Sequence, residues 1–561
     1  MASVKSDRGK SRPLRQPRPT LASKTRKRKQ NVQPEKARSQ LSLESFARLD
    51  RSAVILLVFL LCLSHWAIRV FIAPVYTIEE ADQLLMSQSF QLGYDARQPP
   101  MIAWVHAMAA AWPGLSGPVV FAIKYALLFV ALTFYYLSAR NVLTKPAASA
   151  AAVGAWALTF VVGWAIHEDL IVGVALMASL SLTLHALTRI LTWRRNRDWF
   201  YLGLSLGLGL LTHHLFIVLP LALFFATFLS PFFREAMKPM RLVGALLVAA
   251  AIYSPYAVWL TAHPDRIAEI GQDVAATWEI DGGWLERAGA GAVSLARTLL
   301  QFSLPLSLFW LTLFWTMWLP VLYPVFARRS TDEEQHEAAW RALFARAMLI
   351  GAAIFVVGVL IGVQSWKSYW ILPALYTGPL WMFLHVKRAG EFPVAIRAFA
   401  ALAIALVGAV AAGRFVEWRL EIETCEEGGC RPYAPIAAWA EELRSSGFEA
   451  GTIVGAVPHL TGNLRGAMLE ARVMDASLPA DSFPPAVTRG ACLAVWRETL
   501  FDAERKVAVM PAKLASYLND ELRSPPHDLG ADGAIRRNLT LSKSKSATLY
   551  FQFVPPSDAC R

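Results

Sequence analysis

The stretch Ile78–Trp104, IEEADQLLMSQSFQLGYDARQPPMIAW, follows the first long apolar run of the chain. It begins with three acids close together, Glu79, Glu80 and Asp82. Carboxylates at the point where a helix leaves the hydrocarbon are costly to place and usually serve a function. A structural explanation is also open, because acids in the first turn of a surface helix are stabilised by the helix dipole.

The composition indicates a membrane protein. Of the 561 residues, 55% are hydrophobic and 17% are charged, whereas a soluble domain carries about 25% charged residues. Apolar runs of about 20 residues, long enough to cross about 30 Å of hydrocarbon, recur through the first three quarters of the chain. We therefore expect an α-helical polytopic membrane protein with about eleven transmembrane helices. The expected spans are 53–75, 116–138, 147–165, 170–190, 199–212, 214–232, 242–262, 299–326, 343–363, 369–386 and 395–415.

The basic residues predict a topology for these spans. Lys and Arg gather in every second connection, as in Arg194, Arg195 and Arg197 after the fourth span. By the positive-inside rule these connections are cytoplasmic, and the N-terminus lies on the same side. The part of the chain after residue 415 is then expected outside. The outer connections would be 76–115, 166–169, 212–214, 263–298 and 364–368.

Residues 1–50 carry 14 Lys and Arg against 4 Asp and Glu. We expect a disordered basic cytoplasmic tail, because this segment has too little apolar surface to order itself. Such a tail is attracted to anionic membrane lipid, which we favour over nucleic acid as its partner. No cleavable signal peptide is expected, since the first apolar run begins near Ser52 and is long.

The C-terminal part, 416–561, changes character and predicts a small extracytoplasmic α/β domain. Short alternating patterns occur in GTIVGAV, PHLTGNLRGAML, ARVMDA and CLAVW, followed by a helical stretch, PAKLASYLNDEL, and two β-like runs, AIRRNLTLS and ATLYFQFV. Four of the five cysteines lie here, and the spacing CEEGGC predicts a disulfide between Cys425 and Cys430 in an oxidising compartment. Cys62 is expected to pack in the first helix. His459 alone does not make a zinc site, so no metal is expected. The expected domains are therefore 1–50, 51–415 and 416–561.

Further polar residues fall in the expected outer connections. His167, Glu168 and Asp169 are consecutive between two apolar helices, and Lys367 lies between Trp366 and an aromatic pair, Tyr369 and Trp370. The connection 263–298 holds Trp278 and Trp284 among acidic and glycine residues, a pattern typical of amphipathic helices on the membrane surface. The ionisable groups thus gather at helix ends on the outer side, as an enzyme working there requires.

The layout resembles the GT-C glycosyltransferases of the protein-mannosyltransferase type, which include the bacterial lipid A aminoarabinose transferases. In that family an Asp-Glu pair follows the first transmembrane helix, and a Pro-Pro-x-x-x-Trp segment comes about twenty residues later. Here Glu79-Glu80 takes the place of the pair, and Pro99, Pro100 and Trp104 match the second part. The resemblance covers most of residues 52–490. It continues in HEDLIVGVALMASLSLTLHAL, GLSLGLGLLTHHLFIVLPLALF, QSWKSYWILPAL and PHLTGNLRGAMLEARV.

The resemblance implies an inverting transfer of a sugar from a polyprenyl phosphate to an envelope acceptor, which is lipid A, core, glycan or protein. The work would take place at the outer face of the bacterial inner membrane, without a cofactor. Glu79 would be the base, and Glu80 would orient it or bind the acceptor. Arg97, Lys367, His213 and His214 would stabilise the departing phosphate. The substrate-binding candidates are Asp82, Tyr94, Arg97, His167, Glu168, Asp169, His213, His214 and Lys367.

Structural explanations for these residues remain open. Arg97 has Asp95 and Glu80 as possible ion-pair partners, and Lys367 has the membrane interface within reach of its long side chain. His213-His214 also fits a polar break between helices, His167–Asp169 a hydrophilic turn, and the aromatic residues near Lys367 an interfacial belt. As a second function class, a transporter or flippase of an amphipathic lipid-linked substrate would need charged or helix-breaking positions near the middle of the bilayer.

Overall fold

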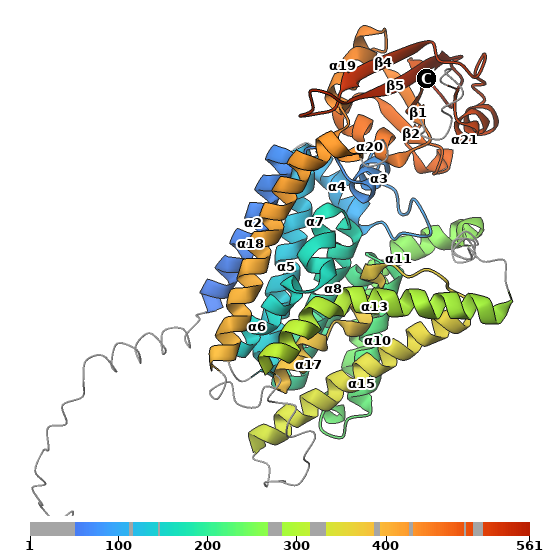
Figure 1. Ribbon diagram of the computed structural model, residues 1–561. Helices are drawn as coiled ribbons and strands as arrows, with labels where there is room; N and C mark the ends of the chain where they lie inside the picture. The colour runs from blue at the N-terminus through green and yellow to red at the C-terminus, as the bar shows by residue number, and fades with distance from the viewer. Residues whose placement is uncertain are drawn as a thin grey trace, which may run out of the picture. The chain divides into compact units, whose positions relative to one another are not determined.

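A computed structural model describes residues 51–111, 116–143, 146–267, 283–314, 332–385, 393–425, 430–486, 490–497 and 509–561. The basic tail at 1–50 lies outside these residues, as does Trp278 in the expected connection 263–298. From Leu49 to Arg561 the chain forms one unit, in which a helical part is followed by a sheet-containing part (Figure 1).

Helices fill the described chain from Arg51 to Thr424, as the apolar runs predict. They are α2 (Arg51–Ile72), α3 (Ile78–Met86), α4 (Met101–Ala111), α5 (Gly117–Val142), α6 (Pro146–Ala157), α7 (Ile166–Glu168), α8 (Ile171–Trp193), α9 (Asn196–Leu210), α10 (Val218–Phe228), α11 (Pro239–Ala262), α13 (Trp284–Phe314), α15 (Asp332–Leu360), α16 (Leu372–Leu375), α17 (Gly378–Leu384) and α18 (Pro393–Thr424). The helical membrane class is therefore confirmed.

The number of spans stays a prediction. Among the described residues, seven helices are long and apolar enough to cross a membrane, or up to eight if the bent pair Pro146–Ala157 and Val161–Glu168 is one span. Three expected spans fall on shorter helices: 199–212 on α9, 214–232 on α10, and 369–386 on α16 and α17. The break between α9 and α10 coincides with His213 and His214.

Two boundaries differ from expectation. Helix α13 begins at Trp284, so 284–298 is the first half of one long helix and not part of a separate connection. Helix α18 continues past residue 415, the expected end of the last span, to Thr424. In both places a polar stretch extends an apolar helix, and composition alone does not mark where such a helix stops.

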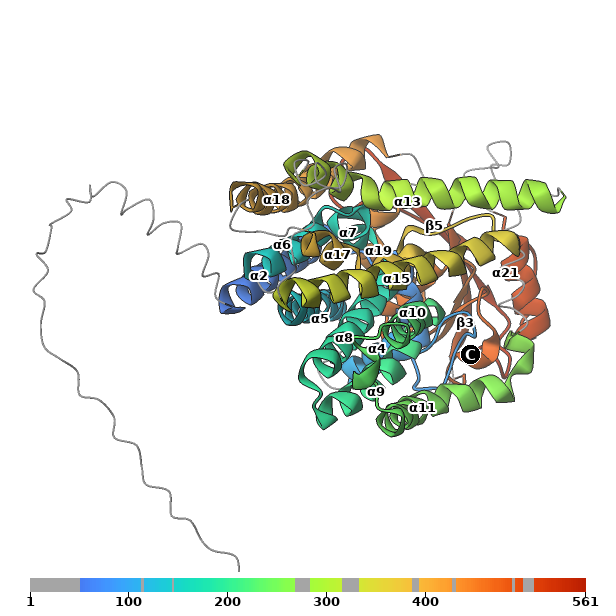
Figure 2. The same cartoon turned by 90° about the horizontal axis from the view of Figure 1, so that it is seen from below.

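Helix α8 forms the interior of the bundle, between α5 and α9 (Figure 2). Its side chains are mostly apolar, and 89% of the residues in its most apolar 18-residue stretch are buried, as expected for a helix enclosed by others. The Ser181 hydroxyl on α8 donates to the carbonyl of Ala131 at 2.6 Å and pairs with the Tyr376 hydroxyl at 2.5 Å. Helix α8 thus provides a fixed frame whose N-terminus lies beside the start of α3.

The C-terminal part is an α/β domain, as predicted. Its five-stranded sheet has the order β2-β1-β3-β5-β4, in which β1 pairs in parallel with β2 and β3, while β5 is antiparallel to β3 and β4. The elements are α19 (Ile436–Ser445), β1 (Gly451–Gly455), α20 (Pro458–Ala467), β2 (Arg472–Asp475), β3 (Ala491–Arg497), α21 (Ala512–Ser516), β4 (Gly533–Asn538) and β5 (Ser546–Val554). The alternating pattern read in PHLTGNLRGAML is wrong, because Pro458–Ala467 forms helix α20. Pro458 lies in the first turn of this helix, where its missing N–H costs nothing.

Two disulfides lie in the described C-terminal part. Cys425 and Cys430 are joined across a Cα–Cα distance of 5.4 Å at the end of α18. A second bridge joins Cys492 on β3 to Cys560 near the C-terminus, 68 residues away. The sequence did not predict this second pair, because no local spacing connects the two cysteines. Cys62 is free and buried.

Candidate active site

Helix α3 carries the acidic stretch and begins directly after α2. Its first turn contains Glu79 and Glu80, and Glu80 Oε2 accepts a hydrogen bond from the backbone N–H of Thr77 at 3.0 Å. This contact satisfies one of the N–H groups that a helix start leaves without a partner. This capping contact fixes the start of α3 and thereby the positions of Glu79 and Glu80.

Glu80 is held in a buried ion-pair network. Its carboxylate accepts hydrogen bonds from Arg69 Nη2 at 2.7 Å and from Lys124 Nζ at 3.2 Å, and none of its side chain is exposed. Burial alone would raise the pKa of Glu80, but the charges of Arg69 and Lys124 outweigh it and lower that pKa to about 2. Glu80 is thus ionised, enclosed and fully engaged, which suits a positioning group and not a proton acceptor. The surface-helix explanation does not fit it.

Glu79 lies half-buried at the N-terminus of α8. Its Oε2 accepts the backbone N–H of Val172 at 3.1 Å. Leu170, in the left-handed conformation with φ of 65°, turns the chain so that α8 starts beside Glu79. Burial and the neighbouring Asp169 carboxylate raise the pKa of Glu79 to about 8. A carboxylate tuned to near-neutral pH suits general-base chemistry.

Asp169 completes a pair with Glu79. Its Oδ1 accepts the hydroxyl of Thr77 at 2.5 Å and the backbone N–H of Glu79 at 3.3 Å. Burial raises the pKa of Asp169 as well. The negative charge of Asp169 disfavours ionisation of Glu79, so the two carboxylates act as a coupled pair.

Asp82 extends the acidic cluster toward the α/β domain. Burial raises its pKa to about 7, and the carboxylates of Asp475 and Asp169 add to this effect. Asp475 ends strand β2, so the cluster draws on the first loop, the start of α8 and the C-terminal domain. Among the described residues, no group of three or more His, Cys, Asp or Glu side chains is arranged to hold a metal ion.

His167 and Glu168 point away from the acidic cluster, although they precede Asp169 in sequence. The His167 ring stacks on His65 with centroids 3.6 Å apart. Glu168 accepts from Trp164 Nε1 at 2.8 Å and from Arg414 NH1 at 2.8 Å. Of the three consecutive polar residues, only Asp169 therefore joins Glu79.

The two predicted histidines at the helix break face different partners. His213 accepts the N–H of Leu215 through Nδ1 at 3.0 Å, and its ring lies edge-on to Tyr369 with centroids 5.8 Å apart. His214 donates from Nε2 to the carbonyl of Ala96 at 2.8 Å. His213 thus lies on the side of Tyr369, whereas His214 anchors the loop between α3 and α4.

Lys367 is exposed, and its Nζ lies 5.8 Å from the Trp370 ring centre. Its charge acts on Glu79 and on His213, which places all three around one region. Lys367 is therefore an exposed cation near Glu79, whereas Lys124 is buried against Glu80.

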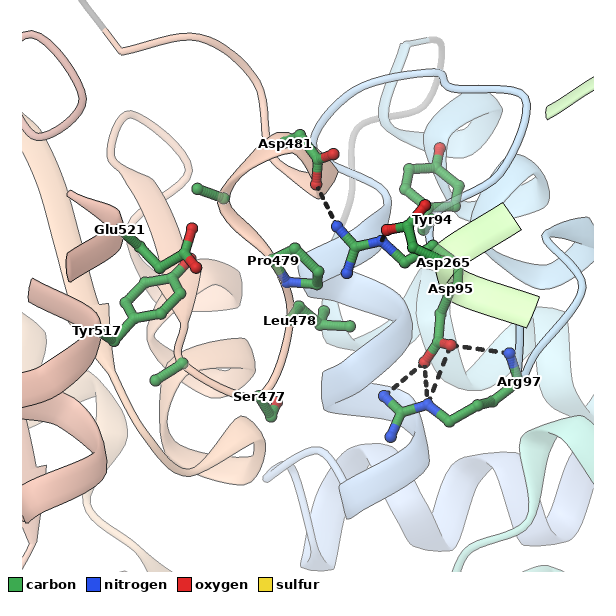
Figure 3. Close-up of a pocket in the computed structure, with 13 residues that line it drawn as sticks. Tyr94, Asp95, Arg97, Asp265, Ser477, Leu478, Pro479, Asp481, Tyr517 and Glu521 are labelled. Carbon is green, nitrogen blue, oxygen red and sulfur yellow. Dashed lines mark hydrogen bonds and ion pairs between the residues drawn. The ribbon is translucent and has the colours of Figure 1, made fainter. Parts of the chain in front are cut away.

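A cavity of about 690 Å³ opens beside the acidic cluster (Figure 3). Tyr94 and Arg97 line it, as does Asp95, which binds Arg97 NH2 at 2.6 Å. Of the two ion-pair partners suggested for Arg97 by the sequence, the structure gives Asp95. The opposite wall comes from the α/β domain and includes Tyr517 and Glu521, which no sequence pattern singled out.

The α/β domain also holds the acidic helix in place. The carboxamide of Asn463 on α20 binds the backbone of Tyr76, the residue before the N-cap of α3. Gly462 lies so close that a Cβ atom there would sit 2.2 Å from the carbonyl oxygen of Ala81 on α3. At the other end of α3, Gln88 accepts the N–H of Val473 at 2.9 Å and donates to its carbonyl at 2.7 Å. These contacts join segments more than 380 residues apart in the sequence. The sequence pointed to α20 only through the resemblance of PHLTGNLRGAML to a segment of the glycosyltransferase family, and it gave no sign that α20 contacts α3.

Comparisons with known proteins agree with this architecture. Residues 97–259 match the family model "Dolichyl-phosphate-mannose-protein mannosyltransferase". The lipopolysaccharide core galacturonosyltransferase RgtA of Rhizobium johnstonii is 27% identical over 487 residues, which are 85% of this chain and 92% of that protein. The related RgtB of the same organism is 27% identical over 460 residues, 79% of this chain and 86% of that protein.

The fold is similar to that of a solved structure. ArnT from Cupriavidus metallidurans in the apo state superposes with a TM-score of 0.50 at 15% identity, covering 82% of this chain and 96% of that chain. The relatives named here support a transferase and not the transporter alternative. The family model, the relatives and the fold together support a membrane glycosyltransferase of the GT-C type.

Proposed function

We propose that this protein transfers a hexuronic acid of the galacturonic type from a polyprenyl phosphate to a hydroxyl group of the lipopolysaccharide core. The sugar and the acceptor come from the names of two relatives that align over most of their own length. The observation that carries the mechanism is Glu79, a half-buried carboxylate with a raised pKa in the first turn of α3.

In the proposed reaction the acceptor hydroxyl attacks the anomeric carbon of the donor. The new bond joins the acceptor oxygen to that carbon, and the bond from the carbon to the phosphate oxygen breaks with inversion. Glu79 takes the proton of the hydroxyl, and the polyprenyl phosphate leaves with the bonding electrons. A positioned base contributes about 10²- to 10⁴-fold to such a step.

The groups around Glu79 fit separate roles. The buried network of Glu80, Arg69 and Lys124 fixes the start of α3 and acts through Glu79 without touching substrate. Lys367 is the cation exposed toward the same region, and we assign it to the charge that develops on the leaving phosphate. His213 stays neutral, because burial lowers its pKa to about 4, and we assign it to donate a hydrogen bond to the same phosphate.

We also propose that the site faces the periplasm of a bacterial inner membrane, with the N-terminal tail in the cytoplasm. The two disulfides of the C-terminal domain support this orientation, because disulfides persist in oxidising compartments. The polyprenyl chain of the donor would lie in lipid beside the bundle, where its apolar surface needs no special partner.

Purified protein in proteoliposomes tests the proposal. The donors are polyprenyl-phosphate galacturonic acid and, in parallel, polyprenyl-phosphate aminoarabinose, with lipopolysaccharide that lacks core galacturonic acid as acceptor. We expect mass spectrometry to detect a hexuronic acid on the core with the first donor only. Transfer from the second donor alone would contradict the proposed sugar, and transfer from neither would contradict the proposed function.

A further inference from the structure

The cavity beside the acidic cluster has the size of a ligand site. Its volume of about 690 Å³ falls within the range of about 300–1,000 Å³ that is usual for small-molecule pockets. In Figure 3, Asp95 and Arg97 from the first outer loop lie on one side, and Tyr517 and Glu521 from the α/β domain lie on the other, across the segment 477–479. The cavity therefore exists only where the two parts of the chain meet.

The lining excludes an acyl chain as the occupant. Only four of the lining side chains are apolar, namely those of Ala476, Leu478, Pro479 and Ala480. The others carry hydroxyl, carboxylate or guanidinium groups, which lose their hydration without compensation against a hydrocarbon chain. A ligand rich in hydroxyl groups fits this lining better.

The charges of the lining disfavour an anionic ligand. Carboxylates outnumber guanidinium groups in it, and both arginines are already paired. Arg97 Nε binds Asp95 Oδ2 at 2.8 Å. Arg266 NH2 binds Asp481 Oδ1 at 3.1 Å. Carboxylates are strong acceptors for hydroxyl donors, so the net effect favours uncharged, hydroxyl-rich groups.

One side chain of the lining lacks a partner that a ligand would supply. Tyr517 is only 7% exposed, and its hydroxyl has no hydrogen-bond partner among the described residues. Buried hydroxyl groups normally have one, and an exception calls for an explanation. Glu521 ends the same short helical turn and contributes an exposed carboxylate to the lining. Together they offer a donor and an acceptor to a bound molecule.

The cavity connects electrostatically to the proposed base. Asp82 feels the charges of Asp95 and Arg97, which line the cavity, and of Asp169, which binds the backbone of Glu79. Asp82 is thus coupled electrostatically both to the cavity and to the acid pair.

We propose that this cavity is the acceptor subsite and binds an uncharged, hydroxyl-rich saccharide segment of the acceptor, with Tyr517 and Glu521 as hydrogen-bonding partners. This inference rests on the proposed function and names the part of the acceptor that is recognised. The acceptor is then held by its sugar residues, and its acyl chains are not needed for binding.

Binding of a lipid-free probe tests the subsite without requiring turnover. The probe is the core oligosaccharide released from lipopolysaccharide by mild acid, titrated calorimetrically into the full-length protein in detergent. We expect Tyr517→Phe and Glu521→Gln each to weaken binding about tenfold, as the loss of one hydrogen bond predicts. The matched control is Asp520→Asn, an exposed neighbour outside the cavity, which should bind like the wild type. Glu521 is exposed, so its replacement should leave folding intact.

The outcomes separate this inference from the proposed function. Wild-type protein that does not bind the lipid-free probe contradicts the subsite, as do cavity variants that bind it unchanged. In the transfer assay the cavity variants should raise the acceptor KM about tenfold and leave the donor KM unchanged. An equal rise in the donor KM would assign the cavity to the donor and overturn the inference, while the transferase itself would stand.

Discussion

The carboxamide of Asn463 hydrogen-bonds both the backbone N–H of Tyr76, at 2.9 Å, and its backbone carbonyl, at 3.0 Å. Tyr76 lies next to Thr77, the residue that caps the helix carrying Glu79 and Glu80. The C-terminal domain therefore acts as a clamp on the acidic helix, in addition to lining the cavity. Asn463 therefore helps to position Glu79, although it lies far from Glu79 in the sequence.

Replacing Asn463 by Ala should impair transfer. The change leaves two buried backbone groups of Tyr76 without partners, which costs about 1–3 kcal/mol of stability for each group. A small displacement of α3 should then lower kcat by about 10²-fold. Turnover and thermal unfolding in detergent measure both effects, with the exposed Asn519→Ala as control. Wild-type turnover in the Asn463 variant would show that the clamp does not position the base.

Replacing Gly462 by Ala should have a similar effect for a steric reason. Alanine normally stabilises a helix interior relative to glycine by about 1 kcal/mol. At Gly462 the new Cβ would lie 2.2 Å from the Ala81 carbonyl oxygen, so α3 and α20 must move apart. We expect lower turnover and a lower melting temperature. Gly244→Ala on α11, where no atom lies within 4 Å of the new Cβ, should retain both.

The rate of transfer should rise with pH. Burial and Asp169 raise the pKa of Glu79 to about 8, and a general base acts only when deprotonated, so kcat/KM should increase between about pH 6 and about pH 9. Asp169→Asn removes the neighbouring negative charge, which lowers the pKa of Glu79 and shifts the profile to lower pH. A pH–rate profile of both proteins measures this shift. An unshifted midpoint, or a shift to higher pH, would contradict the coupling of the two carboxylates.

Lys124→Met should destabilise the protein strongly. Lys124 is 1% exposed and lies against the fully buried Glu80, which would keep only Arg69 as a counter-charge. Removing one partner of a buried ion pair typically costs about 3–5 kcal/mol. Thermal unfolding in detergent should show a large loss for Lys124→Met, and little for the exposed Lys238→Met. Equal melting temperatures for the two variants would show that Glu80 does not depend on Lys124.

Short-range sequence patterns predicted the helices, several strands and the acidic loop. Apolar run length gave the helical membrane class, and alternation gave the strands around Ile453 and Leu493, because each reflects a repeat within a few residues. The acidic loop was found in the same way, from its position after the first span. Hydrophobicity did not fix where α13 and α18 begin or end, since polar residues extend both helices.

Long-range partners were not predictable from the sequence. Arg69 and Lys124 lie inside apolar spans and look like isolated charges until the fold brings them to Glu80. The Cys492–Cys560 pair and the Asn463 clamp connect distant segments without any periodic signal. Neighbours in the sequence also have different partners in the fold: His167 packs against His65, whereas Asp169 contacts Glu79.

The central claim is that Glu79 is the base, and sugar transfer by Glu79→Gln tests it most directly. Glutamine keeps the size of the side chain and can still accept the Val172 N–H through its carbonyl oxygen, so the protein should fold and insert normally. The measurement is transfer from a polyprenyl-phosphate donor in proteoliposomes at matched protein levels, with Glu168→Gln as the control carboxylate. We predict a loss of at least about 10²-fold for Glu79→Gln and a rate near wild type for Glu168→Gln. Transfer by Glu79→Gln at the wild-type rate would contradict the account.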